Sequence, residues 1–414
     1  MSLFRLLRSS VRVLWREGPR SFAARVRNRL AGPAEAAVTP NAMSMVKSTD
    51  AVRVDWTRPP EHLLFPQSAS EGPLTIAWVM SPPSPNSGGH QNLFRFIDYA
   101  EKAGHRCQIY FYTNTSIVVN PIDMKAMLKA SSGFPDLQAS MSMYTSAKGV
   151  DSSVDAIFAT SWETAYPVFL DNSRARRFYF VQDFEPAFYP VGSESMLAEN
   201  TYRFGFHGLT AGGWLSEKLS SEYGMPTDHY DFAVDRDRYS VVNTGARSEV
   251  FFYARPSTPR RGFELGVLAL QEFATRRPDV TINMAGEDVS AFDLPFEFRN
   301  LAGMDVSMLN DVYNRCAAGL VISATNMSLL PLELMASGVT PVVNDAPNNR
   351  LVSDNPFIEY VPASAGAIAD RLVEVLERHD AQERSVAMSR SLDGLSWDDS
   401  GRQFVSAFER AMRG

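Results

Sequence analysis

Short apolar runs alternate with amphipathic segments along most of the chain. Apolar runs at residues 74–80 and 107–112 have the length and composition of buried strands. Between them, residues 92–103 carry apolar positions at helical spacing, and Gly104 ends the segment. A strand, a helix and a second strand in this order predict one βαβ unit.

The same alternation continues in two series. The first series has expected strands at 154–159, 177–182, 208–211 and 229–234, and expected helices at 163–170, 196–204 and 214–223. The second has expected strands at 250–253, 280–284, 319–323 and 340–343, and expected helices at 262–275, 306–316, 365–378 and 397–412. This order predicts an α/β fold with two doubly wound parallel sheets, and ligands at the carboxyl ends of their strands.

Four segments follow from this pattern. Residues 1–72 combine a basic amphipathic helix with a Pro-, Ala- and Ser-rich linker. Residues 73–245 and 246–396 are expected to be the two Rossmann-like domains. We expect residues 397–414 to form a last helix that crosses back to the first domain.

One segment near the end of the second sheet combines structural and chemical signals. Pro331 suits the first turn of a short helix, and Gly338 suits the left-handed position after its end. Between them, Glu333 is the one acid in an otherwise apolar helix. A helix start favours an anion, and a carboxylate beside it can accept the hydroxyls of a ribose. The alternative is that Glu333 only complements the helix dipole.

Composition narrows the class of protein. The chain has 414 residues, 45% of them apolar and 21% charged, which indicates a globular protein with more than one core. Cys107 and Cys316 lie in apolar contexts and provide neither a disulfide framework nor metal-ligand spacing. No apolar run has the length of a membrane span or of a secretory signal. We therefore expect a cytoplasmic protein.

The formal net charge of −7 hides a basic N-terminal segment. Residues 1–30 contain eight arginines and a single acid, Glu17. On a helix, these arginines and the apolar residues would lie on separate stripes, as in helices that bind the anionic inner face of a membrane. Packing on a protein surface is the alternative. Nucleic acid is disfavoured as a partner because the remaining chain is acidic.

Over roughly residues 74–412, the chain resembles GT-B glycosyltransferases, in particular the retaining group numbered family 4. Glu333, the Ala336-Ser-Gly338 turn and the strand Pro341-Val-Val343 match the family's pattern. The resemblance implies that Glu333 holds the ribose of a nucleotide-sugar donor. It also implies the GT-B fold, a sugar-transfer reaction and an acceptor hydroxyl on a glycan, which can be lipid-linked.

A basic loop supplies the second match. The family has an arginine, a short loop and a Lys-Gly pair that bind the donor diphosphate, and here Arg255 and Arg261 take those positions, with Arg260 as a rival. Arginine in place of lysine keeps the charge and adds a fork suited to phosphate oxygens. The resemblance also assigns the pair Gly88 and Gly89 to the approach of backbone to the donor phosphate.

One position departs from the family. Thr325 stands where the first glutamate of the family's pair contacts the transferred sugar. Thr325 and Asn326 can donate and accept hydrogen bonds but carry no charge. The segment is most similar to rhamnosyltransferases of the WsaF type, which implies dTDP-rhamnose as donor. An apolar lining near Leu329 and Leu330 would suit the methyl group of this sugar.

Proton transfer has several candidate residues in the first half. His90 follows the glycine pair and titrates near neutrality. Asp183 and Glu185 follow an expected strand and are candidates for acceptor contacts, with Asp183 also a candidate catalytic group. No cofactor or metal is expected, since the acidic Asp235-Arg-Asp237 sequence matches the turn that joins the two domains.

Other functions remain open from the sequence. A dinucleotide-dependent enzyme is disfavoured because no G-x-G-x-x-G follows either first strand. A nucleotide-sugar epimerase on the same fold, or a binding module without catalysis, stays a competing hypothesis.

Overall fold

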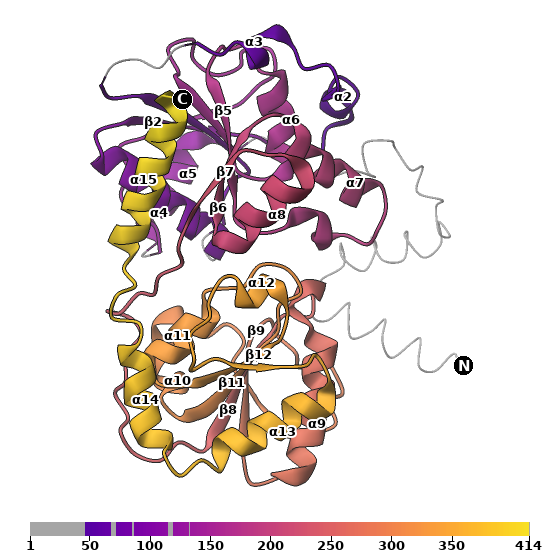
Figure 1. The fold of residues 1–414 in the computed structure, drawn as a ribbon, viewed down its shortest axis with the longest axis vertical. Coiled ribbons are helices and arrows are strands. Elements are labelled where there is room, and N and C mark those ends of the chain that lie inside the picture. The colour runs from indigo at the N-terminus through magenta and orange to yellow at the C-terminus, as the bar shows by residue number, and fades with distance from the viewer. Residues whose placement is uncertain (1–45, 68–71, 85–86, 115–118, 132, 414) are drawn as a thin grey trace, which may run out of the picture. The chain divides into compact units, whose positions relative to one another are not determined.

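The computed structural model describes residues 46–67, 72–84, 87–114, 119–131 and 133–413 (Figure 1). The expected basic helix within residues 1–30 lies outside the described residues. Residues 50–414 form one compact unit that contains both parallel sheets. None of the described helices combines the length and apolarity needed to span a membrane.

The first sheet has seven parallel strands in the order β3-β2-β1-β4-β5-β6-β7. Its strands are β1 Thr75–Met80, β2 Arg106–Phe111, β3 Ser140–Met143, β4 Ala156–Ala159, β5 Arg176–Val181, β6 His207–Ala211 and β7 Thr227–Tyr230. The order reverses between β1 and β4, which is where an open α/β sheet binds ligands at its carboxyl edge.

Helices precede and connect these strands. They are α2 Ser48–Ala51, α3 Glu61–Leu64, α4 Gly88–Lys102, α5 Pro121–Ala130, α6 Trp162–Leu170, α7 Ser193–Asn200 and α8 Gly213–Tyr223, with 3₁₀ turns η2 Glu185–Phe188 and η3 Thr201–Arg203. An aromatic cluster fills the core, where the Trp78 ring stacks on Phe158 with centroids 4.2 Å apart.

The second sheet has six parallel strands in the order β10-β9-β8-β11-β12-β13. Its strands are β8 Glu249–Ala254, β9 Thr281–Gly286, β10 Arg299–Asn300, β11 Cys316–Val321, β12 Thr340–Asn344 and β13 Glu359–Val361. Its helices are η4 Pro259–Arg261, α9 Phe263–Arg276, η5 Val306–Met308, α10 Leu309–Tyr313, α11 Leu330–Ala336, α12 Pro347–Arg350, α13 Ala365–Leu376 and α14 Ala381–Arg390.

Alternate residues of β8 face different layers of this core. Phe252 packs in the layer that contains Leu270 of α9 and Leu372 of α13. Phe251 packs in the other layer, with Tyr313 of α10 and Met335 of α11. The sheet is therefore covered on both faces, as parallel sheets require.

The last helix, α15 Trp397–Arg413, packs against α4 and β7 of the first sheet (Figure 1). Phe404 joins the cluster around Trp78. Tyr99 Oη donates a hydrogen bond to Asp398 at 2.9 Å. Gly401 lies directly on the Tyr99 ring, and a Cβ there would come within 2.4 Å of it. The close approach of the two helices thus requires glycine at this position.

The two doubly wound sheets predicted from the sequence are confirmed, and some boundaries differ. Helix α4 begins at Gly88, not at residue 92, because Ser87 caps it by accepting from the His90 N–H. The helix expected at 306–316 ends at Tyr313, and Cys316 begins β11. The small residues of β11 are not typical of a strand. Gly319 is one of them, and it must be small because a Cβ there would meet Leu334 at 2.6 Å.

Candidate functional site

Arg255 directly follows β8 at the carboxyl end of the second sheet. Its Nε donates to Glu287 Oε1 at 2.9 Å and its Nη1 donates to Tyr253 Oη at 3.2 Å. Glu287 also accepts the Ser257 N–H at 2.9 Å, which fixes the start of the basic loop. The Arg255 guanidinium is thus oriented by two side chains and remains more than one-third exposed, with 38% of its side-chain surface accessible.

Two further cations, Arg260 and Arg261, lie in the 3₁₀ turn η4. Gly262 ends this turn with φ of 59°, and a Cβ there would lie 2.4 Å from Ile322. Glycine therefore lets the turn lie against β11, which brings Arg261 Nη1 to 3.0 Å from Ser323 Oγ. The Arg260 guanidinium lies 3.9 Å above the Phe188 ring. Burial lowers the pKa of Arg261, but nearby Asp183 opposes this shift.

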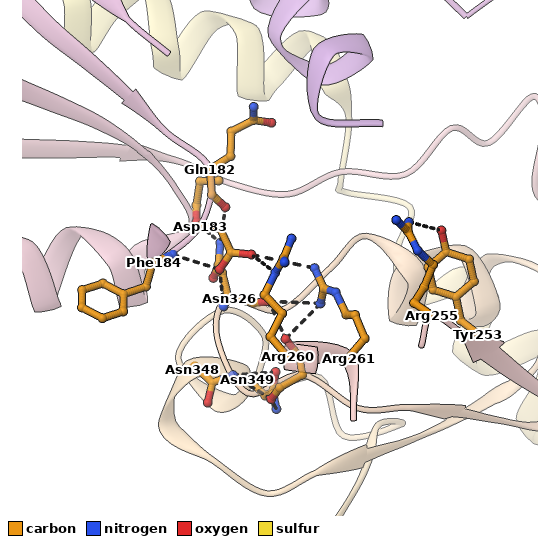
Figure 2. A network of polar contacts seen from close by, with 12 residues as sticks. Gln182, Asp183, Phe184, Tyr253, Arg255, Arg260, Arg261, Asn326, Asn348 and Asn349 are labelled. Carbon is orange, nitrogen blue, oxygen red and sulfur yellow. Dashed lines mark hydrogen bonds and ion pairs between the residues drawn. The ribbon is translucent and has the colours of Figure 1, made fainter. Parts of the chain in front are cut away.

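Asp183, at the carboxyl end of β5 in the first sheet, meets both cations (Figure 2). Its Oδ2 lies 3.2 Å from Arg260 Nε and 3.9 Å from Arg261 Nη2. Its Oδ1 accepts the N–H of Asn326 at 2.9 Å. A single carboxylate therefore ties the basic loop and the loop after β11 to the first sheet.

Asn326 is held by backbone of the first sheet. Its Nδ2 donates to the carbonyl oxygen of Gln182 at 3.1 Å and to that of Ala211 at 2.9 Å. The residue is 2% exposed. The hydrogen bonds from its amide nitrogen join the two sheets, a role that its sequence position did not indicate.

An asparagine cluster at the end of β12 and just after it positions this loop, and it was not predicted from the sequence. Asn344 Oδ1 accepts the Ser323 N–H at 2.8 Å, and its Nδ2 donates to the Ser323 carbonyl at 3.0 Å. Asn348 and Asn349 donate to the same carbonyl at 3.1 and 3.3 Å. The signal available was the run of asparagines that follows an expected strand.

The glycine pair lies in the first turn of α4, not in a loop as expected. The Gly89 carbonyl accepts from Gln182 Nε2 at 3.1 Å, which joins α4 to the residue preceding Asp183. A Cβ on Gly88 would meet no atom within 4 Å, and one on Gly89 would make an ordinary contact. Packing within the protein therefore does not require glycine here, although glycine in a helix costs roughly 0.5–1 kcal/mol relative to alanine. This leaves room for a ligand to approach the backbone.

His90 is engaged through both ring nitrogens. Nδ1 lies 2.7 Å from Ser87 Oγ, and Nε2 lies 3.0 Å from the Ser81 carbonyl oxygen. Burial lowers the pKa of the imidazole. The ring therefore supports the turn into α4, and neither nitrogen is available as a base without breaking a hydrogen bond.

Glu333 lies in the first turn of α11, close to the segment that links the two sheets. Burial raises the pKa of Glu333 to about 7, against the opposing effects of Arg238 and of a hydrogen bond with Tyr239. Its side chain remains partly exposed. The expected features around it are present, with Pro331 in the first turn of the helix and Gly338 at φ of 78° after its end.

The charged neighbours of Glu333 differ from those of the basic loop. Arg238, Asp235 and Arg95 act on Glu333, whereas Asp183, Arg260 and Arg255 act on Arg261. The arginines follow β8 and Glu333 lies in the helix that follows β11, both at the carboxyl edge of the second sheet, and each group has its own charged neighbours.

Three further candidates are more enclosed than expected. Glu185 is 6% exposed and accepts the Trp162 N–H at 2.6 Å, and burial raises its pKa well above the usual range. A buried carboxyl with this role is not placed to contact an acceptor. Thr325 is 1% exposed, and its hydroxyl has no hydrogen-bond partner among the described residues. Leu330 is also buried, and Leu329 precedes it as the N-cap of α11.

The described residues contain no group of three or more His, Cys, Asp or Glu side chains arranged to hold a metal ion. Positive charge at the candidate site comes instead from Arg255, Arg260 and Arg261, opposed locally by Asp183 and Glu287.

We expect Asp183→Asn to tighten the binding of a nucleoside diphosphate severalfold. The substitution removes the carboxylate that occupies Arg260 and Arg261 and would repel an incoming diphosphate. Calorimetric titration of the wild-type and variant proteins measures the change. Unchanged or weaker binding would show that Asp183 does not compete with the ligand for these cations.

The chain is similar to known proteins in sequence and in fold. Residues 248–373 match the family described as WsaF, C-terminal domain. The O-antigen biosynthesis protein RfbC of Myxococcus xanthus is 33% identical over 306 residues, which make up 71% of this chain and 24% of RfbC. The chain thus spans about a quarter of the length of this relative.

Solved structures show the fold. The pneumococcal O-GlcNAc transferase GtfA, solved with UDP and GlcNAc, superposes with a TM-score of 0.61 at 11% identity, covering 82% of this chain and 99% of GtfA. A glycosyltransferase from Rickettsia africae gives 0.56 at 13% identity, covering 83% and 99%. A putative UDP-N-acetylglucosamine 2-epimerase from Listeria monocytogenes gives 0.53 at 9%, covering 82% and 97%.

Proposed function

Because this chain has the GT-B fold and a WsaF-like second domain, we propose that it is a glycosyltransferase of O-antigen or polysaccharide biosynthesis. In this proposal it moves a sugar from a nucleotide diphosphate to a hydroxyl of a glycan acceptor. The observation that carries it is the arginine group that follows β8 at the carboxyl edge of the second sheet, together with Glu333 in the first turn of α11, the helix that follows β11 at the same edge.

The arginines supply what departure of a diphosphate needs. Negative charge grows on the leaving phosphate as the bond to the anomeric carbon breaks, and cations already held in position stabilise that charge. Arg255 is oriented by Glu287 and Tyr253, and Arg261 by Ser323. We propose that Glu333 accepts hydrogen bonds from the ribose hydroxyls. These hydrogen bonds favour the ionised form of Glu333.

The sugar side of the site supports a deoxy sugar. Thr325 Oγ1 and Asn326 Oδ1 both lack a hydrogen-bond partner among the described residues, so each can bond a sugar hydroxyl after a small rearrangement. Met327 in the same loop and Leu330 at the start of α11 are buried apolar side chains close to these two residues in the chain. We propose rhamnose, from dTDP-rhamnose, as the transferred sugar.

The acceptor proton is proposed to leave with the donor phosphate. Both nitrogens of His90 are engaged, and the Asp183 carboxylate is shared among Arg260, Arg261 and Asn326. A transfer in which the leaving phosphate takes the proton, with retention of configuration, requires no protein base.

We expect dTDP to raise the melting temperature more than UDP or GDP at equal concentration. A ligand that binds only the folded state stabilises it by about 2.7 kcal/mol at a concentration of 100 Kd. Thermal unfolding with each nucleotide measures the ranking. An equal or reversed ranking would remove the dTDP assignment while leaving the nucleotide site itself in place.

A nucleotide-sugar epimerase is the second candidate, since one putative epimerase superposes on this chain. Incubation with a nucleotide sugar alone separates the two functions. A transferase leaves the sugar configuration unchanged without an acceptor, whereas an epimerase produces a new isomer. Nucleotide binding without a new isomer, and without sugar transfer once an acceptor is added, would indicate a module without catalysis.

The basic segment is proposed to bind an anionic membrane surface, where a lipid-linked acceptor would be located. Deleting residues 1–30 is expected to lower binding to vesicles that contain anionic lipid, because each basic residue near such a surface contributes about 1 kcal/mol. Vesicle sedimentation measures this, with dTDP affinity as the control that should not change. Retained vesicle binding would assign the segment another purpose.

A further inference from the structure

A cavity of about 240 Å³ lies at the amino ends of the strands of the second sheet, away from the candidate site. Its lining includes Arg247 before β8, Ala317 in β11 and Thr340 at the start of β12. Ser248 and the six residues of β8 separate Arg247 from Arg255, and β8 alone spans roughly 20 Å at about 3.3 Å per residue. The cavity is therefore distinct from the edge that carries Arg255 and Glu333.

Three arginines make this cavity strongly positive. Arg378 and Arg384 line it, and both bond the single carboxylate Glu359, at 2.7 and 2.9 Å. Arg371, which does not line the cavity, bonds Glu359 as well. Arg247 lines the cavity too, and among the described residues no carboxylate lies within ion-pairing distance of it. The cations around the cavity thus outnumber the acids that neutralise them.

Hydrogen-bond donors are also left without partners here. Arg247 Nε, Arg378 Nη1, Arg384 Nε and Ser385 Oγ, all on lining residues, are buried and make no hydrogen bond among the described residues. Ser385 is 5% exposed. Its Oγ lies against Gly338, where a Cβ would approach it to 2.0 Å, so the cavity wall is kept open by a glycine. Unpaired buried donors destabilise a folded protein, so their gathering at one cavity points to a missing acceptor.

We propose that this cavity binds a small phosphate-bearing anion. Guanidinium groups pair with phosphate through two parallel hydrogen bonds, and the ligand would supply acceptors to the unpaired nitrogens and to Ser385. The volume is below the ~300–1,000 Å³ of pockets for drug-sized ligands, which suits inorganic phosphate or a phosphate monoester. The site is independent of the donor site and of the sugar that is transferred.

Calorimetric titration with inorganic phosphate tests the proposal, using the full chain saturated with dTDP and held at constant ionic strength. Arg378→Met and Arg384→Met are expected to weaken phosphate binding at least tenfold. Arg371→Met is the matched control, because it removes a partner of the same Glu359 without changing the cavity lining, and it should bind phosphate within twofold of wild type.

A second experiment distinguishes a free phosphate anion from a lipid phosphate as the ligand. Vesicles with phosphatidic acid are compared with phosphatidylcholine vesicles for wild type and Arg378→Met. Binding of inorganic phosphate without Arg378-dependent vesicle binding supports a free anion, and Arg378-dependent vesicle binding supports a lipid headgroup. No saturable binding in either arm, or equal losses in Arg371→Met and Arg378→Met, would overturn the proposed site.

Discussion

Replacing Arg255 with alanine is expected to lower kcat/KM for sugar transfer by about 10²–10³-fold. A positioned donor to a developing charge is typically worth this much because it acts in a pre-organised, partly desolvated site. Arg255 meets that condition, since Glu287 and Tyr253 fix its guanidinium before any ligand arrives. Steady-state turnover, together with the dTDP dissociation constant, measures the two effects separately.

Controls distinguish loss of a phosphate contact from damage to the loop. Arg255→Lys should recover part of the activity, because it keeps the charge but not the fork. Arg277→Ala removes a partly exposed arginine of the same domain that pairs with Asp279, and should change neither parameter. Activity of Arg255→Ala within threefold of wild type would contradict the diphosphate role.

The second large effect is expected from Glu333→Gln, which should weaken dTDP binding about tenfold. A hydrogen bond to a charged acceptor contributes roughly 1.5–3 kcal/mol, and the amide keeps one weaker acceptor. Titration of dTDP at pH 7.5 measures the loss. Equal affinity in the variant would show that the ribose lies elsewhere.

The raised pKa of Glu333 adds a pH signature. In the ligand-free folded protein the carboxyl titrates with a pKa of about 7, whereas its ordinary value is 4.5. Between these two pH values the folded state keeps the Glu333 proton and the unfolded state loses it. The free energy of unfolding therefore falls as the pH rises from about 4.5 to about 7. Ligand-free Glu333→Gln should lack this contribution, so the melting temperature of wild type should drop relative to the variant across that window. Parallel curves would contradict a raised pKa at Glu333.

The fold was largely predictable because its main strands are long apolar runs. Phe251 and Phe252, for example, sit in a run that can only be buried on both faces. Strands β3 and β13 were not predicted, since Ser140–Met143 alternates serine with methionine and Glu359–Val361 spans three residues. Short or partly polar edge strands depend on their neighbours rather than on their own pattern.

The candidate site was predictable only in part. Each sequence motif was local, so the basic loop and the Glu333 segment could be found separately. The link through Asp183 was not visible, because it joins residues 143 positions apart in the chain, as in its contact with Asn326. The partner of Arg255, Glu287, also lies on another strand end and carried no local signal. His90 and Glu185 had a local signal, but the hydrogen bonds that their side chains make indicate structural roles.

Acceptor-dependent transfer is the most direct test of the proposed function. Wild-type protein is incubated with dTDP-rhamnose, with or without a lipid-linked glycan acceptor, and released dTDP and extended glycan are quantified. We expect both products in equal amounts only when the acceptor is present. Absence of transfer from dTDP-rhamnose and from a panel of other nucleotide sugars, or formation of a new sugar isomer without acceptor, would contradict the account.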